Sequence, residues 1–199
     1  GVCRWNSLDS SISWLTENDG LSNNNIRLIL EDSWGSYWFA TSGGGISKYS
    51  GQQFDHYDKN KGLAGNFIYS ICNDKNGSLW IGVSDKGICK YSNNQFSTLY
   101  RDSSLINGRV KAICEGKDST IWFGIDGIGL CMYDGSEFID IDELDGKYIR
   151  DIKIDTSGNI WVATLGAGLY RLTPKNSENK KFNVKRFYSK KKDADNRIN

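Results

Sequence analysis

Few side chains of this chain of 199 residues are suited to catalysis or metal binding. His56 is its single histidine, so the chain has too few histidines for a histidine metal cluster and little basis for a histidine-based catalytic triad. We expect His56 to face solvent from an outer strand. Carboxylates gather at Asp140, Asp142, Glu143 and Asp145, a set that could bind Ca²⁺. Because these four residues sit in one flexible connection, a solvated acidic loop is the favoured interpretation. The sequence therefore predicts no catalytic residue, no metal and no cofactor.

A glycine-rich segment, "SGGG" at Ser42 to Gly45, could suggest a phosphate-binding loop. The same position recurs further along the chain as "SDKG", "DGIG" and "LGAG". A tight turn that occurs once in each repeat explains all four segments better than a phosphate site.

The five cysteines also follow a repeat. Cys72 and Cys114 occupy one equivalent position, while Cys3, Cys89 and Cys131 occupy another. An odd number excludes complete internal pairing, and equivalent positions in different repeats lie far apart. Within one repeat, Cys72 and Cys89 would be roughly 10 Å apart, too far for a disulfide. We expect buried free thiols.

The elements that must position any site come from an internal repeat of about 42 residues. Tryptophans recur at intervals of 42, 42 and 39 residues, as Trp38, Trp80, Trp122 and Trp161. A glycine follows each of them after seven residues, and an aspartate opens the preceding turn in three repeats, as Asp32, Asp74 and Asp155, with Gly116 in the remaining one. We expect the four tryptophans in the core.

Each repeat contains four short β segments separated by turn signals. In the second repeat these are Ile68 to Asn73, Leu79 to Val83, Gly87 to Tyr91 and Gln95 to Leu99. Four antiparallel strands per unit at nearly constant length indicate an all-β fold, a β-propeller of four-stranded antiparallel blades.

The predicted blades do not make a closed ring. We expect a half blade at 1–19, four blades at 20–61, 62–103, 104–143 and 144–190, and the start of a further blade at 191–199. A closed ring leaves no sheet edge bare. The predicted partners of the open flanks are therefore the remaining propeller blades or another copy of the chain.

Composition excludes two other classes of partner. Lys plus Arg number 25 and Asp plus Glu 24, so the net charge of +1 offers no extended field for nucleic acid. No stretch approaches the roughly 18 apolar residues of a membrane helix, and no signal peptide is evident. We expect no membrane contact by this segment, and a solvated edge for the basic run 180–192.

The pattern "GLSNNNIRLILEDSWGSYWFATSGGGISKYSGQQFDHY", at 20–57, resembles the two-component regulator propeller repeat. The specific parts are Gly-Leu with Asn before the first strand, the Asp-x-x-Gly turn, the "WFAT" or "WIGV" strand and the "GGGI" loop. Departures occur at Gly116, Ser119, Lys147 and Leu172. The resemblance implies a periplasmic or extracellular sensor module of a hybrid two-component system. A membrane span and a histidine kinase would then belong to the full-length protein, and breakdown products of carbohydrates would be the first ligands to test.

Candidate ligand-binding residues follow from the strand order. In such propellers, the connections that enter the first strand and those that join the second strand to the third gather on one face. The side chains there combine aromatic rings with charged or amide groups, which suit a small polyhydroxylated ligand such as an oligosaccharide. The candidates are Asn25, Arg27, Asn66, Phe67, Tyr69, Asp85, Lys86, Arg109, Lys111, Asp126, Tyr148 and Arg150.

Two other functions stay open at this point. Some propellers with related Trp-Gly repeats are lyases, so a propeller lyase or hydrolase is the first alternative. Such an enzyme would need a cluster of titratable groups at the axis, and the sequence shows no strong one. The second alternative is a structural propeller that binds other proteins only.

Overall fold

A computed structural model describes residues 1–84, 87–99, 108–176 and 181–188. The chain divides into two compact units, Gly1–Tyr100 and Arg101–Asn199, which are described separately below. Antiparallel sheets dominate both units, and the described helical segments are three short 3₁₀ turns, at Glu17–Asp19, Lys59–Lys61 and Asp142–Leu144. The expected all-β class is confirmed.

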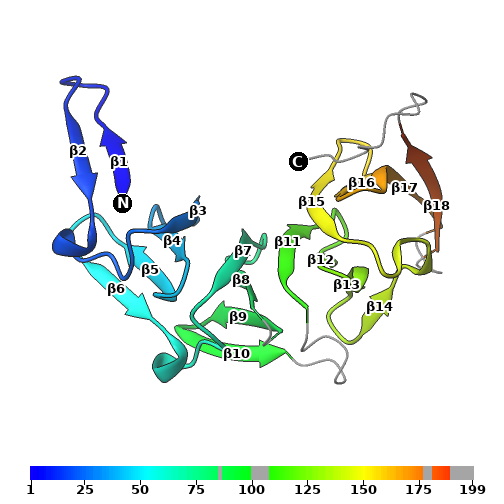
Figure 1. Cartoon of the computed structure of the whole chain (residues 1–199), viewed down its shortest axis with the longest axis horizontal. Helices are drawn as coiled ribbons and strands as arrows, with labels where there is room; N and C mark the ends of the chain where they lie inside the picture. Colours follow the sequence, from blue (N-terminus) through cyan, green and yellow to red (C-terminus); the bar gives the residue numbers. More distant parts are fainter. Residues whose placement is uncertain (85–86, 100–107, 177–180, 189–199) are drawn as a thin grey trace. The chain divides into compact units, whose positions relative to one another are not determined.

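The first unit contains a two-stranded sheet followed by two four-stranded sheets (Figure 1). The two-stranded sheet pairs β1 (Val2–Trp5) with β2 (Ile12–Leu15). The first blade consists of β3 (Ile26–Glu31), β4 (Tyr37–Thr41), β5 (Ile46–Tyr49) and β6 (Phe54–Tyr57). The second blade consists of β7 (Ile68–Asn73), β8 (Leu79–Val83), β9 (Ile88–Ser92) and β10 (Gln95–Leu99). In each blade the strands pair in chain order.

The second unit repeats this arrangement twice. The third blade consists of β11 (Val110–Glu115), β12 (Ile121–Ile125), β13 (Gly129–Tyr133) and β14 (Phe138–Asp140). The fourth blade consists of β15 (Ile149–Ile154), β16 (Ile160–Thr164), β17 (Gly168–Asn176) and β18 (Lys181–Phe187). The four-stranded meander predicted for every repeat is therefore observed in all four. The predicted segment 191–199 lies outside the described residues.

Three blades share a contact that we call the Asp–Trp clasp. In the first blade, one carboxylate oxygen of Asp32 accepts the indole N–H of Trp38 at 2.8 Å. The other oxygen accepts two backbone N–H groups of the β3–β4 turn, at 2.9 and 3.0 Å. One side chain therefore fixes both the turn and the core tryptophan. The equivalent pairs are Asp74 with Trp80 and Asp155 with Trp161, each at 2.9 Å.

Two of the repeat tryptophans, Trp38 and Trp122, pack between neighbouring sheets. Trp38 is 2% exposed, and its ring lies 5.1 Å from that of Tyr91 on the next blade. Trp80 and Trp122 are also buried, and Trp122 meets Phe182 of the fourth blade edge-on at 5.2 Å. These three confirm the predicted core.

The fourth repeat tryptophan departs from that prediction. Trp161 is only half-buried. Its aromatic partner Phe187, at 5.6 Å, and the guanidinium of Arg171, at 5.7 Å, both belong to its own sheet. Because these contacts come from one sheet alone, they cover the indole less completely than two facing sheets cover Trp38 and Trp122.

The glycine that follows each tryptophan by seven residues has a steric role. Gly45 has a φ of +78°, and a Cβ there would lie 2.2 Å from the carbonyl oxygen of Tyr57 on the adjacent strand. At Gly129 a Cβ would lie 2.3 Å from the carbonyl oxygen of Leu144. Any side chain would push the third strand away from the residues that follow the fourth, so glycine is required.

Removal of one clasp carboxylate should destabilise the fold. We expect Asp74→Ala to lower the free energy of unfolding by about 1–3 kcal/mol, because a buried indole N–H and two backbone N–H groups lose their acceptor. Urea unfolding followed by tryptophan fluorescence measures this change. The control Asp55→Ala, at an exposed strand position, should cost less than about 0.5 kcal/mol. Equal effects of the two variants would contradict the structural role of the clasp.

The clasp also predicts how stability responds to acid. Hydrogen bonds from the side chain of Asn159 and then from the indole of Trp161 lower the pKa of Asp155 from 3.8 to about 2. Because this pKa is lower in the folded state, the ionised carboxylate of Asp155 stabilises the protein above about pH 4. This contribution to stability is lost as the pH falls through about 2. The urea midpoint of the wild type should therefore exceed that of Asp155→Asn at about pH 5 and approach it near pH 2. A difference that stays constant over this range would contradict the assignment.

Candidate functional site

One backbone hydrogen bond recurs in all four blades and brings two connections together. The N–H of the residue after the second strand donates to the carbonyl oxygen of the residue before the first strand. The pairs are Ser42 with Asn25, Ser84 with Phe67, Asp126 with Arg109, and Leu165 with Tyr148, at 2.8–3.0 Å. Each blade therefore places the entrance to its first strand beside the connection from its second strand to its third, as the sequence predicts.

A β-bulge lies directly after this contact in every blade. The pairing of the first and second strands skips one residue, between Ile26 and Leu28 in the first blade. The same shift recurs in the other three blades. A bulge leaves one residue unpaired and changes the direction of its side chain, and it is common beside binding sites. The skipped residues are the predicted candidates Arg27, Tyr69, Lys111 and Arg150.

In the first unit, these positions form an aromatic and cationic group. The guanidinium of Arg27 lies over the ring of Tyr69, 4.5 Å from its centroid, and its Nη2 donates to Ser42 Oγ at 3.2 Å. Phe67 is 51% exposed, and a Cβ on Gly43 would lie 3.6 Å from its ring. The ring therefore covers a glycine of the first blade with one edge and keeps much of its surface in solvent.

Two further candidates of this unit have different environments. The carbonyl oxygen of Asn66 accepts the N–H groups of Gly43 and Gly45, at 3.1 and 2.9 Å, and its side-chain oxygen accepts that of Lys59 at 2.9 Å. Asn66 therefore links the first blade to the second and positions Phe67. Asn25 is exposed beside Arg27.

The second unit repeats the arrangement with other side chains. Tyr148 is also 51% exposed, and a Cβ on Gly127 would lie 3.7 Å from its ring. Gly127 is the repeat equivalent of Gly43, so an aromatic ring covers the same glycine position in both units. Arg150 pairs with Asp126 at 3.5 Å, and both side chains are more than half-buried, at 33% and 13% exposure. The charged pair ties the guanidinium to the residue before the glycine that Tyr148 covers.

The remaining candidates add little to these two groups. Arg109 is exposed and Lys111 is half-buried in the third blade. Asp85 and Lys86 lie outside the described residues. The structure thus joins Arg27 to Tyr69 and Ser42 in the first unit and Arg150 to Asp126 in the second. In both units an aromatic ring, Phe67 or Tyr148, covers the glycine that follows the arginine's partner.

Sequence reasoning missed three residues of these groups. Gly43 and Gly127 provide the space that the aromatic rings occupy, and Ser42 accepts the Arg27 hydrogen bond. The segments "SGGG" and "DGIG", to which they belong, indicate a tight turn but no binding role. The signal that could have identified them is the aromatic residue that precedes the first strand in the following repeat.

Histidine and carboxylate chemistry finds no support in the described part of the chain. His56 is half-buried, with Nδ1 3.2 Å from Ser47 Oγ, so the expectation of a solvent-facing histidine is wrong. The paired strand β5 supplies Ser47 directly opposite His56, which explains the contact. Asp142, Glu143 and Asp145 are exposed. Among the described residues, no group of three His, Cys, Asp or Glu could hold a metal ion.

The cysteines are free thiols, but they are not uniformly buried. Cys89 and Cys131 are buried, Cys72 and Cys114 are half-buried, and Cys3 is exposed, which corrects the expectation for Cys3. Cys3 lies in the two-stranded sheet, which offers it no covering blade in the first unit. Its repeat equivalents Cys89 and Cys131 lie in four-stranded sheets.

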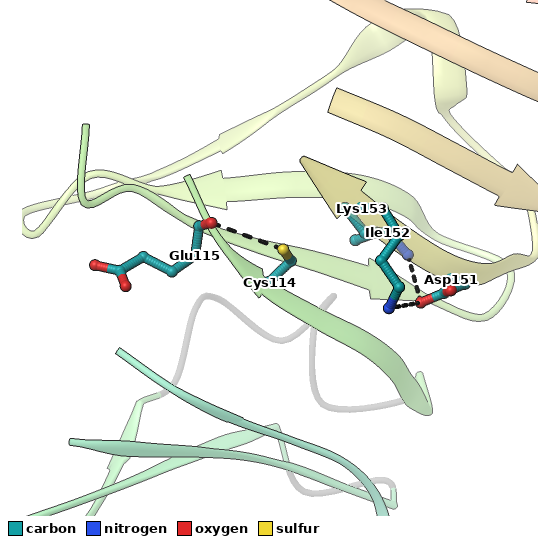
Figure 2. A network of polar contacts seen from close by, with 5 residues as sticks. All are labelled: Cys114, Glu115, Asp151, Ile152 and Lys153. Carbon is teal, nitrogen blue, oxygen red and sulfur yellow. Dashed lines mark hydrogen bonds and ion pairs between the residues drawn. The ribbon is translucent and has the colours of Figure 1, made fainter. Parts of the chain in front are cut away.

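Cys114 shows how burial affects a thiol in this fold. Burial raises its pKa, and the nearby ammonium of Lys153 opposes this only in part. Figure 2 shows the thiol donating to the backbone carbonyl of Glu115 at 3.7 Å, while Lys153 pairs with Asp151 at 3.1 Å. A thiol of raised pKa stays protonated at neutral pH and is a weak nucleophile.

Comparison with known proteins supports the fold. The extracellular domain of the putative hybrid two component system BT3049 from Bacteroides thetaiotaomicron matches 96% of the chain with a TM-score of 0.71 and 20% identity. The corresponding domain of BT4673 from the same organism matches 87% with a TM-score of 0.68 and 22% identity. The chain spans 26% and 24% of these two domains. Virginiamycin B lyase from Staphylococcus aureus matches 84% of the chain at 16% identity, with 56% of the lyase covered and a TM-score of 0.63.

Two further comparisons concern sequence. The model of the family "two component regulator propeller" matches residues 20–43, 62–85 and 143–166. No curated protein sequence matches the chain. Within the described residues, no helix has the length and apolar character that a membrane crossing requires.

These findings define the class of the protein. With its repeated four-stranded antiparallel sheets and its structural neighbours, the chain is a segment of a β-propeller. More particularly, three of its repeats match the model of the two component regulator propeller, which confirms the resemblance drawn from its sequence.

Proposed function

We propose that this chain is a ligand-sensing module in the periplasmic or extracellular region of a hybrid two-component system. The three matched propeller repeats support this proposal. So does the likeness to extracellular domains of two putative hybrid two component systems. The segment itself is proposed to be non-catalytic: ligand binding, and not chemistry, would be its contribution to signalling.

Carbohydrate fragments are the proposed ligand class. The observation that carries this proposal recurs in both units: a half-exposed aromatic ring covers a glycine, and an arginine binds the residue before that glycine. Phe67 and Tyr148 offer flat apolar surface on which a sugar ring can stack. Arg27 and Arg150, which bind Ser42 and Asp126 next to the covered glycines, carry further N–H donors from which sugar hydroxyls can accept hydrogen bonds. Each unit would provide one such contact group.

The proposed partners of the chain are further propeller blades or a second copy. The antiparallel register places Cys3, Trp5, Ile12 and Trp14 on one face of the β1–β2 sheet, since Trp5 pairs with Ile12 and Cys3 with Trp14. The last three are 63–64% exposed. Such an apolar face is the type of surface that buries itself against another sheet.

The ligand proposal is tested by thermal-shift screening against oligosaccharide mixtures from polysaccharide digests, followed by calorimetry with the active fraction. Phe67→Ala and Tyr148→Ala should each weaken binding by about tenfold, equivalent to roughly 1.4 kcal/mol. The control is Trp34→Ala, which removes an aromatic ring 73% exposed in the β3–β4 turn and should leave affinity unchanged. If no digest raises the melting temperature, or if the control weakens binding equally, the carbohydrate proposal fails.

The partner proposal is tested by sedimentation velocity over a concentration series. The isolated chain should self-associate at high concentration through the exposed β1–β2 face. The double variant Trp5→Ser/Trp14→Ser should remain monomeric under the same conditions, because it removes most of the apolar surface of that face. The control Trp34→Ser removes an exposed tryptophan elsewhere and should still associate. A wild-type chain that stays monomeric throughout would overturn the role of this face.

A further inference from the structure

The third blade covers only one face of the fourth blade. Side chains alternate between the two faces of a strand, so Phe182 and Phe187 of β18 lie on opposite faces. Phe182 meets Trp122 of the third blade, whereas Phe187 meets Trp161 of its own sheet. Among the described residues of the second unit, no further sheet packs on the side of Trp161. This indole therefore stays half-buried.

The uncovered surface is cationic. The strand registers place Lys153, Trp161, Arg171 and Lys185 in one row across the sheet, and we call this row the Trp161 face. Lys153 pairs with Asp151 at 3.1 Å, but no carboxylate of the described residues pairs with Arg171 or Lys185. The Nε of Arg171 is buried without a hydrogen-bond partner among these residues. A carboxylate from a partner can compensate this charge.

The β1–β2 face is built like the surface that covers Trp38 within the first unit. In the second blade, Tyr91 pairs with Phe96, and the ring of Tyr91 lies 5.1 Å from that of Trp38. The repeat aligns Trp5 with Tyr91, and Ile12, which pairs with Trp5, takes the place of Phe96. Trp5 and Ile12 are both 63% exposed. They therefore offer the surface that a repeat tryptophan of another blade would cover.

A charged contact fits beside this apolar one. Lys48 follows Trp38 by ten residues, and Arg171 is its equivalent in the fourth repeat. Lys48 lines one cavity together with the β9–β10 turn of the next blade, at 92–94. The β1–β2 turn corresponds to that turn and carries the exposed Asp9. The same packing would therefore place Asp9 next to Arg171 of another copy.

We infer that the Trp161 face of one copy packs on the β1–β2 face of a second copy, head to tail. Trp161 then meets Trp5 and Ile12, and Arg171 pairs with Asp9. The contact is heterologous, because the two faces are different surfaces of the chain. It rests on the self-association proposed above and specifies the surface that the second copy contributes.

Charge-reversal variants of the full chain test this contact by sedimentation velocity at low ionic strength. Arg171→Glu and Asp9→Arg should each weaken association by about tenfold or more, because like charges then meet across the contact. An equimolar mixture of the two variants should associate like the wild type. In the mixture the new glutamate faces the new arginine, and the unchanged Asp9 faces the unchanged Arg171. The control Lys61→Glu makes the same charge change at an exposed 3₁₀ turn and should leave association unchanged.

The outcomes separate this contact from the broader partner proposal. A wild type that stays monomeric overturns both. If the wild type associates and Trp5→Ser/Trp14→Ser does not, but Asp9→Arg associates like the wild type, the β1–β2 face binds another surface and only the present inference is refuted. Asp9 lies in an exposed turn, so this result does not depend on the folding of Arg171→Glu.

The mixture gives a second criterion. If the two variants lose association but their mixture does not recover it, the pairing of Arg171 with Asp9 is refuted. Should Arg171→Glu fail to fold, Lys185→Glu from the same row takes its place, since Lys185 is exposed. Lack of recovery in that mixture refutes the head-to-tail contact equally.

Discussion

The hydrogen bond between a turn aspartate and the indole N–H of a repeat tryptophan is the contact on which three of the four blades depend. An indole placed between two sheets contributes a large apolar surface, but its N–H must find an acceptor within the dry core. The aspartate provides one while its second oxygen holds two backbone N–H groups of the β-turn. One aspartate side chain therefore fixes both the core tryptophan and the turn within its blade.

This constraint leaves the other end of the strands free to vary. The bulge in the first strand and the backbone hydrogen bond beside it recur in every blade, yet the pair of side chains at these positions changes from blade to blade. The pairs are Asn25 and Arg27, Phe67 and Tyr69, Arg109 and Lys111, and Tyr148 and Arg150. Uniform backbone with variable side chains is the arrangement expected of a recognition surface on a repeat scaffold. The repeated backbone fixes where these side chains lie but not which residue types occupy the positions.

The third blade shows that the clasp itself can be modified. Gly116 has no side chain that could accept the indole N–H of Trp122. Asp118 accepts the backbone N–H of Thr120 in the turn, and a cavity lies next to Trp122. The fold tolerates the change because the tryptophan still packs against Phe182 of the fourth blade.

The strand pattern of this protein was determined by its sequence, since alternating short strands and turns are local features, and strands such as Leu79–Val83 and Gln95–Leu99 lie where the repeat predicts them. The burial of Trp38, Trp80 and Trp122 also followed from their period. Tertiary structure decided the rest. The exposure of Cys3, the half-burial of His56 and Trp161, and the partners of Arg27 and Arg150 depend on which strand or blade lies opposite. Neighbours across sheets are set by three-dimensional packing, which no local pattern of residue types encodes.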